Sequence, residues 1–219
     1  MYKMLIIGDS SSLPRIELEY YSTFYAKLKS MYEVETTAKT NNNSYKIYTD
    51  IESLTLYGFN PIVVILNYGI VDVFPRPYPN VIYRFLSCSG LLPYIDKFLK
   101  KTKLYYRLGD FFNFKEVPLD KFEFYSHGII KKLLDKKVEK IIVIGIIRPY
   151  KVLLNSKKVD REIQKYNEVF KNLSHNFKEV EYIDIYSASD EDFTIWDGYH
   201  YSEKASKYIA EEIAKLLND

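Results

Sequence analysis

Short, uninterrupted apolar runs recur along the chain, and they constrain its fold more than any other feature. Four are rich in β-branched residues and a fifth alternates; they cover residues 4–7, 61–66, 141–147, 180–185 and 32–37. Continuous runs of this length are typical of strands buried on both faces of a parallel sheet. Apolar residues at three- and four-residue spacing predict helices over 17–30, 44–56, 122–135, 161–173 and 203–217. Strands that alternate with helices predict a three-layer α/β/α sandwich on about five parallel strands.

No internal repeat or low-complexity linker divides the chain, so we expect a single domain over residues 1–219. Apolar residues make up 47% of it, enough to bury a core without disulfides or metals. Residues 72–117 contain four prolines and are predicted to form loops and helical pieces over one end of the sheet. Cys88 is the only cysteine, which excludes an internal disulfide and any cysteine-based metal site.

The charge balance argues against a dedicated nucleic-acid-binding protein, because 31 Lys and Arg stand against 29 Asp and Glu. No window approaches the roughly 18 consecutive apolar residues of a membrane span. No charged segment, long apolar stretch and cleavage site precede the first apolar run, so we expect no secretory signal. These observations predict a cytoplasmic protein without a membrane span or a nucleic-acid partner, and they leave its oligomeric state open.

The loop Gly8-Asp9-Ser10-Ser11-Ser12 follows the first predicted strand. In open α/β sheets the site lies outside the carboxyl ends of the strands. A serine at this turn can attack an electrophile while backbone amides stabilise the oxyanion, with Asp9 supporting the turn. The alternative is that the serines cap the next helix, since serine is favoured at that position. Neither the dinucleotide fingerprint nor the P-loop pattern occurs in the chain.

A second loop, just before the last predicted helix, contains Asp197 and His200. Their spacing lets a single turn bring the carboxylate and the imidazole together. The carboxylate can then hold the imidazole tautomer while the other ring nitrogen faces a serine hydroxyl. The alternative is an ordinary turn residue and an incidental histidine. The other two histidines, His127 and His175, lie in helical patterns away from the strand ends.

Together the two loops resemble the SGNH (GDSL-type) hydrolase family, which has a G-D-S block after strand one and D-x-x-H before the final helix. Here these blocks read Gly8-Asp9-Ser10 and Asp197-Gly198-Tyr199-His200, and the element order between them also fits. The resemblance implies a flavodoxin-like α/β/α sandwich that hydrolyses or transfers acyl groups. It implies Ser10 as nucleophile, His200 as base and Asp197 as the group that orients His200, with no metal or organic cofactor.

The middle blocks depart from the family pattern. The second block of the family carries a glycine whose amide serves the oxyanion hole, whereas residues 38–44 contain none. Asparagine tolerates the left-handed conformation, so we expect an amide from the Asn41–Asn43 loop, with Asn42 as a candidate. The third block, G-x-N-D, reads Gly69-Ile70-Val71-Asp72 here, so valine replaces a donor asparagine. Asn67, just before Gly69, is the expected substitute; the alternative is a turn residue at the strand end.

Residues 69–76 also resemble a variant third block of SGNH-like proteins associated with bacterial surface-polysaccharide genes. Arg76 lies on a proline-bounded loop and could bind a carboxylate or phosphate of the substrate; the alternative is a surface arginine paired with a loop acid. The resulting hypothesis is a serine esterase or O-acyltransferase for a small acyl group, expected to be acetyl, on a carbohydrate. The alternatives are a thioesterase or lysophospholipase-like enzyme, and a binding protein with weak or no turnover.

Overall fold

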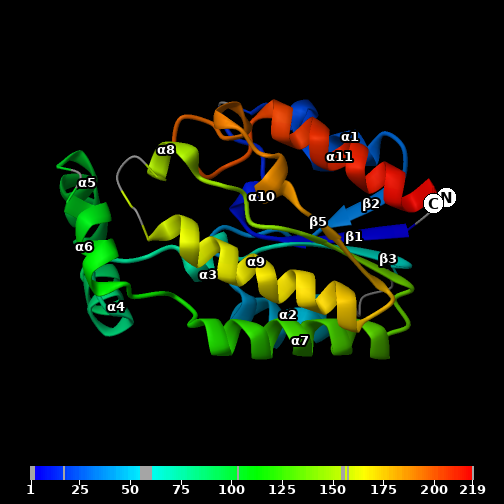
Figure 1. Ribbon diagram of the computed structural model, residues 1–219, viewed down its shortest axis with the longest axis horizontal. Helices are drawn as coiled ribbons and strands as arrows, with labels where there is room; N and C mark the ends of the chain where they lie inside the picture. Colours follow the sequence, from blue (N-terminus) through cyan, green and yellow to red (C-terminus); the bar gives the residue numbers. More distant parts are fainter. Residues whose placement is uncertain are drawn as a thin grey trace.

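The computed structural model describes residues 3–16, 18–54, 61–102, 104–153, 156 and 158–218. Its centre is a five-stranded sheet in the order β2-β1-β3-β4-β5 (Figure 1). The strands are β1 (Lys3–Gly8), β2 (Glu33–Thr36), β3 (Val63–Asn67), β4 (Lys140–Ile144) and β5 (Val180–Ile183). All four neighbouring pairs run parallel, which confirms the five-stranded parallel sheet.

Helices cover both faces of this sheet (Figure 1). One face carries α1 (Phe24–Lys29) and α11 (Glu203–Asn218), and the other carries α2 (Ser44–Leu54), α7 (Leu119–Asp135) and α9 (Val159–Asn176). Side chains of β1 alternate between the two cores: Met4 and Ile6 join one, Leu5 and Ile7 the other. Both faces of the strand are therefore dry, which explains its unbroken apolar run and confirms the three-layer sandwich.

The first predicted helix is wrong in its first half. A short 3₁₀ helix, η2 (Tyr20–Ser22), precedes α1, and Thr23 caps α1 by accepting the Ala26 N–H at 3.2 Å. The other four helices match their predicted ranges to within three residues at the ends that the structure describes. Predicted helical residues 17, 55 and 56 lie outside the described residues.

Residues 72–117 are more helical than predicted. They include the second half of α3 (Ile70–Val73) and all of α4 (Asn80–Cys88), α5 (Leu92–Lys101) and α6 (Leu104–Phe112). In Figure 1 the helices α4, α5 and α6 stand together beyond one end of the sandwich. Several of their apolar side chains are exposed, but within the described ranges no helix is long and apolar enough to cross a membrane.

Candidate active site

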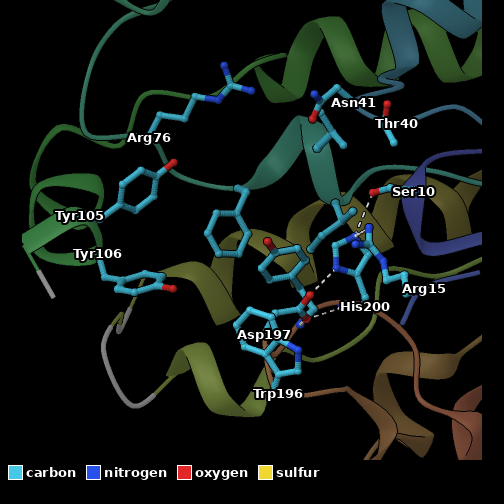
Figure 2. Close-up of a pocket in the computed structure, with 14 residues that line it drawn as sticks. Ser10, Arg15, Thr40, Asn41, Arg76, Tyr105, Tyr106, Trp196, Asp197 and His200 are labelled. Carbon is cyan, nitrogen blue, oxygen red and sulfur yellow. Dashed lines mark hydrogen bonds and ion pairs between the residues drawn. The ribbon is translucent and has the colours of Figure 1, made fainter. Parts of the chain in front are cut away.

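Side chains from opposite ends of the chain meet beside the end of β1 (Figure 2). The Ser10 Oγ lies 2.9 Å from His200 Nε2, and His200 Nδ1 lies 2.5 Å from Asp197 Oδ2. A carboxylate at this distance holds the proton on Nδ1, which leaves the Nε2 lone pair facing the hydroxyl. The structure thus brings together the three residues predicted to be catalytic, in an arrangement that can activate a serine.

Ser10 begins the 3₁₀ helix η1 (Ser10–Ser12), directly after β1. Asp9 caps this turn, because its carboxylate accepts the Ser11 N–H at 2.8 Å, as expected for a supporting residue. The alternative that the serines cap an α-helix is wrong, since the next α-helix begins only at Phe24. The Ser10 hydroxyl is therefore left to face the cavity and His200.

Asp197 and His200 lie between η3 (Glu191–Phe193) and α11. The Asp197 Oδ1 accepts the backbone N–H groups of Tyr199 and His200, both at 3.1 Å. Gly198 permits this tight turn because its φ of +84° lies in the left-handed region. Burial disfavours the charged carboxylate, but hydrogen bonds from the His200 ring and these amides outweigh it and hold the pKa of Asp197 below its ordinary value. An ionised carboxylate therefore faces the imidazole.

Ser10 lines a cavity of about 570 Å³, a size typical of small-molecule sites (Figure 2). Much of its wall is aromatic, and the rest is mostly polar. The lining residues are Ser10, Arg15, Thr40, Asn41, Ile70, Val71, Phe74, Arg76, Tyr105, Tyr106, Trp196, Asp197, Tyr199 and His200. The tyrosines of α6 were not predicted as site residues, because their position depends on how α4, α5 and α6 pack.

Asn41, rather than Asn42, lines this cavity. The Asn41 backbone has a φ of +53°, the left-handed conformation expected to replace a glycine in this loop. Asn42 is buried, and its Nδ2 donates to the Gly8 carbonyl at 3.0 Å, so its side chain serves the loop and not the cavity. In the described part of the chain, the N–H groups of Ser10 and Asn41 have no hydrogen-bond acceptor.

Both polar atoms of the Asn67 side chain are hydrogen-bonded to other side chains of the protein. Its Nδ2 donates to Ser12 Oγ at 2.6 Å, and its Oδ1 accepts the Tyr201 hydroxyl at 2.8 Å. The backbone here is also crowded: a Cβ on Gly8 would lie 2.5 Å from Ser12 Oγ and 2.9 Å from the Asn67 carbonyl oxygen. Asn67 is buried and does not line the cavity, so the prediction that it replaces the missing oxyanion donor is wrong.

Val71 lines the cavity at the third-block position where the family has asparagine. An apolar side chain therefore stands where a donor is expected. Gly69, predicted among the binding residues, does not line the cavity. It precedes α3 with a φ of +116°, and a Cβ there would lie 2.7 Å from Ile146 Cδ1. Gly69 thus serves the packing of this loop, and its prediction as a binding residue is wrong.

Two arginines line the cavity. Arg76 was predicted, and its guanidinium is ion-paired with Glu116 and lies 4.3 Å from the centroid of the Tyr83 ring. This arrangement matches the alternative of a loop-acid pair, although the side chain also borders the cavity. Arg15 was not predicted, because residues 13–16 carry no recognisable motif. Its guanidinium contacts His200 Nε2 directly.

Two buried carboxyl groups, those of Asp9 and Asp72, lie in the segments that form the site. Asp72 accepts both the N–H and the hydroxyl of Ser44, at 2.9 and 2.5 Å, at the start of α2. Burial raises the pKa of Asp9 to about 6 and that of Asp72 to about 7. The folded protein therefore binds protons at pH values where the unfolded chain, with an aspartate pKa of about 3.9, has released them.

We expect these two groups to lower the free energy of unfolding as the pH rises from about 4 to about 7, because the folded state then gives up protons it binds more tightly. The Asp72→Asn variant should shrink the stability difference between about pH 5 and about pH 8 by on the order of 2 kcal/mol. Urea unfolding at the two pH values measures this difference. Asp50→Asn, at a half-exposed aspartate, is the control. An unchanged difference in Asp72→Asn would contradict the raised pKa.

No protein-family model and no curated protein sequence matches the chain. Solved structures do match over nearly their whole length. The esterase EstA from a Pseudoalteromonas species has a TM-score of 0.62 at 14% identity, with 100% of both chains covered. The acetyl xylan esterase AlAXEase has a TM-score of 0.67 at 17% identity, with 98% of both covered. A GDSL-like lipase from Bacteroides thetaiotaomicron has a TM-score of 0.62 at 13% identity, covering 99% of this chain and 88% of its own. The chain therefore has the fold of the SGNH (GDSL-type) hydrolases.

Proposed function

We propose that the protein is a serine esterase of the SGNH type that cleaves a small acyl ester at Ser10. The observation that carries this proposal is the hydrogen-bonded chain from Ser10 through His200 to Asp197 at the wall of the cavity. A serine alone is a weak nucleophile, and an oriented imidazole is what activates it. The esterases and lipases of the same fold support this assignment.

In the proposed reaction the Ser10 Oγ bonds to the acyl carbon while its proton passes to His200 Nε2. The bond from the acyl carbon to the alcohol oxygen then breaks, and the alcohol leaves with the proton from Nε2. Water attacks the acyl-serine in the second half, giving a proton to Nε2, and the acid leaves as Ser10 recovers its proton. An acceptor hydroxyl in place of water would give acyl transfer.

The backbone amides of Ser10 and Asn41 are the proposed oxyanion donors. Both residues line the cavity, and neither backbone N–H has an acceptor within the described ranges. Donors of this kind stabilise the negative charge that develops on the carbonyl oxygen. Because the Val71 side chain has no hydrogen-bond donor, we infer an oxyanion hole with one donor fewer than the family pattern provides.

The Val71→Asn variant should raise kcat/KM by roughly 10-fold. This gain is smaller than the loss of about 10²- to 10³-fold in kcat that removal of one oxyanion donor causes. The gain should appear in kcat, because the new bond forms to the charged transition state. Steady-state rates on p-nitrophenyl acetate measure it, with Val71→Ala as the control for removing the valine. Equal rates in both variants would contradict a donor-deficient hole.

The proposed substrate is an acetyl ester carried by a carbohydrate. The cavity has room for a sugar-sized group, and aromatic side chains, among them Phe74, Tyr105, Tyr106 and Tyr199, line it. Two solved structures of this fold are acetyl xylan esterases. The resemblance of residues 69–76 to the polysaccharide-associated variant supports the same substrate class.

Release of acetate from acetylated xylo-oligosaccharides tests this assignment, beside a series of p-nitrophenyl esters from acetyl to octanoyl and matching CoA thioesters. Preference for the acetyl ester supports it, whereas preference for long acyl chains or thioesters supports the thioesterase or lysophospholipase-like alternative. Val71 and the Arg15 contact favour a second candidate, a binding protein with the same fold and little turnover. Absence of turnover on every ester would favour that candidate.

A further inference from the structure

Two hydrogen-bond donors face the same ring nitrogen, His200 Nε2. The Ser10 hydroxyl and the Arg15 guanidinium both face His200 Nε2 (Figure 2). With the Nδ1 proton held by Asp197, Nε2 has a single lone pair. A guanidinium N–H directed at this lone pair competes with the Ser10 hydroxyl for its base.

Arg15 is held in this place by its own backbone. Arg15 and Leu18 exchange two backbone hydrogen bonds, at 2.9 and 3.1 Å, and Leu18 is buried. The Arg15 Nε is also buried, and among the described residues it has no hydrogen-bond partner. Burying a guanidinium donor without an acceptor is unfavourable, so a ligand that supplies one would be bound.

The protein supplies no ion-pair partner to Arg15 within the part that the structure describes. Asp9 is close enough to interact with its charge, but that carboxylate already accepts the Ser11 N–H. Arg76, in the same cavity, is by contrast paired with Glu116. Of the two arginines, Arg15 is thus the one whose charge is open to an anion from outside.

Charge makes this arrangement unfavourable for a neutral substrate. His200 becomes positively charged when it takes the serine proton, and the Arg15 guanidinium would then repel it at close range. An anion on Arg15 would relieve that repulsion and would draw the guanidinium away from Nε2. The planar fork of arginine suits a carboxylate, sulfate or phosphate group for this purpose.

We propose that Arg15 binds an anionic group of the substrate, and that this binding frees His200 to activate Ser10. The inference rests on the proposed esterase function and specifies its substrate as an acyl ester with a negative charge close to the scissile bond. The charge must be close because Ser10 Oγ and the guanidinium contact the same ring nitrogen. Arg15 is thus a specificity-determining residue, and the anion is part of the working site.

Matched acetyl esters test the proposal on the unmodified protein. The probes are ortho-, meta- and para-acetoxybenzoate, each compared with its neutral methyl ester, and acetate release is measured for all six. At one ring position at least, kcat/KM for the anion should exceed that for the neutral ester by roughly 10- to 100-fold, the range for a charge-assisted hydrogen bond. Ratios near or below one at all three positions would overturn the proposal, while labelling of Ser10 by a fluorophosphonate would show that the esterase assignment still stands.

Four variants locate the effect. Arg15→Met should abolish the preference for the anion and raise the rates on the neutral esters, because no guanidinium then competes for His200 Nε2; loss of structure would not raise any rate. Arg15→Lys keeps the charge without the fork and should keep part of the preference; it serves as the second test if Arg15→Met does not fold. Arg107→Met, at an exposed arginine of α6, is the control. Preference lost in Arg76→Met but kept in Arg15→Met would place the anion at Arg76 and overturn the proposal.

Discussion

Ser10→Ala should lower kcat for ester hydrolysis by about a millionfold, the loss measured when a triad nucleophile is removed. The Ser10 hydroxyl is the group that would form the acyl-enzyme, and within the described residues its one side-chain hydrogen bond is to His200. The residual rate should come from the oxyanion donors and substrate binding alone. Initial rates on p-nitrophenyl acetate, corrected for spontaneous hydrolysis, measure the loss.

The same variant should fold normally, because the turn after β1 is held by the Asp9 carboxylate and not by the Ser10 side chain. Thermal unfolding of Ser10→Ala should therefore match that of the unmodified protein. Ser30→Ala, at an exposed serine, is the control and should change neither rate nor stability. A Ser10→Ala protein that is folded and retains a tenth or more of the rate would contradict the assigned nucleophile.

Asp197→Asn should lower kcat by about 10⁴-fold with little change in KM, as loss of the triad carboxylate does elsewhere. The asparagine can still accept the backbone N–H groups of Tyr199 and His200, so the loop should keep its shape. It removes the negative charge that faces His200 Nδ1, and its amide can favour the tautomer with the proton on Nε2. That tautomer has no lone pair for the Ser10 hydroxyl.

The control for this variant is Asp190→Asn, at a half-exposed aspartate that precedes η3 and is paired with Lys204. It removes the same charge from the residue just before η3, and its kcat should stay within a few-fold of the unmodified value. If Asp197→Asn lowers kcat by less than 10-fold, another group orients the imidazole.

The sheet and the triad could be predicted from the sequence because both rest on local patterns. Strands buried on both faces carry continuous apolar runs, such as residues 4–7 of β1 and 63–66 of β3, and such runs are visible one strand at a time. Ser10 and His200 each lie in a short block beside a predicted element boundary. Their meeting then follows from the fold, since both loops lie at the same end of the sandwich.

The rest of the site depends on contacts between distant segments. Asn67 was predicted to face the cavity, but its direction is set by Ser12 and by Tyr201, which lies 134 positions away in the chain. Asn41 could not be separated from Asn42, because a φ of +53° at one and not the other is a property of the folded loop. The Arg15 side chain contacts His200 while its backbone is paired with that of Leu18, and no residue pattern indicates this pairing.

If Ser10 is a nucleophile activated by His200, it should react covalently with a fluorophosphonate. Intact-mass measurement should show one adduct per chain, peptide mapping should place it on Ser10, and the adduct should be absent in Ser10→Ala. His200→Ala should form it much more slowly, because the base that activates the hydroxyl is gone. No adduct at Ser10, while a known serine hydrolase is labelled in parallel, would show that Ser10 is not an activated nucleophile.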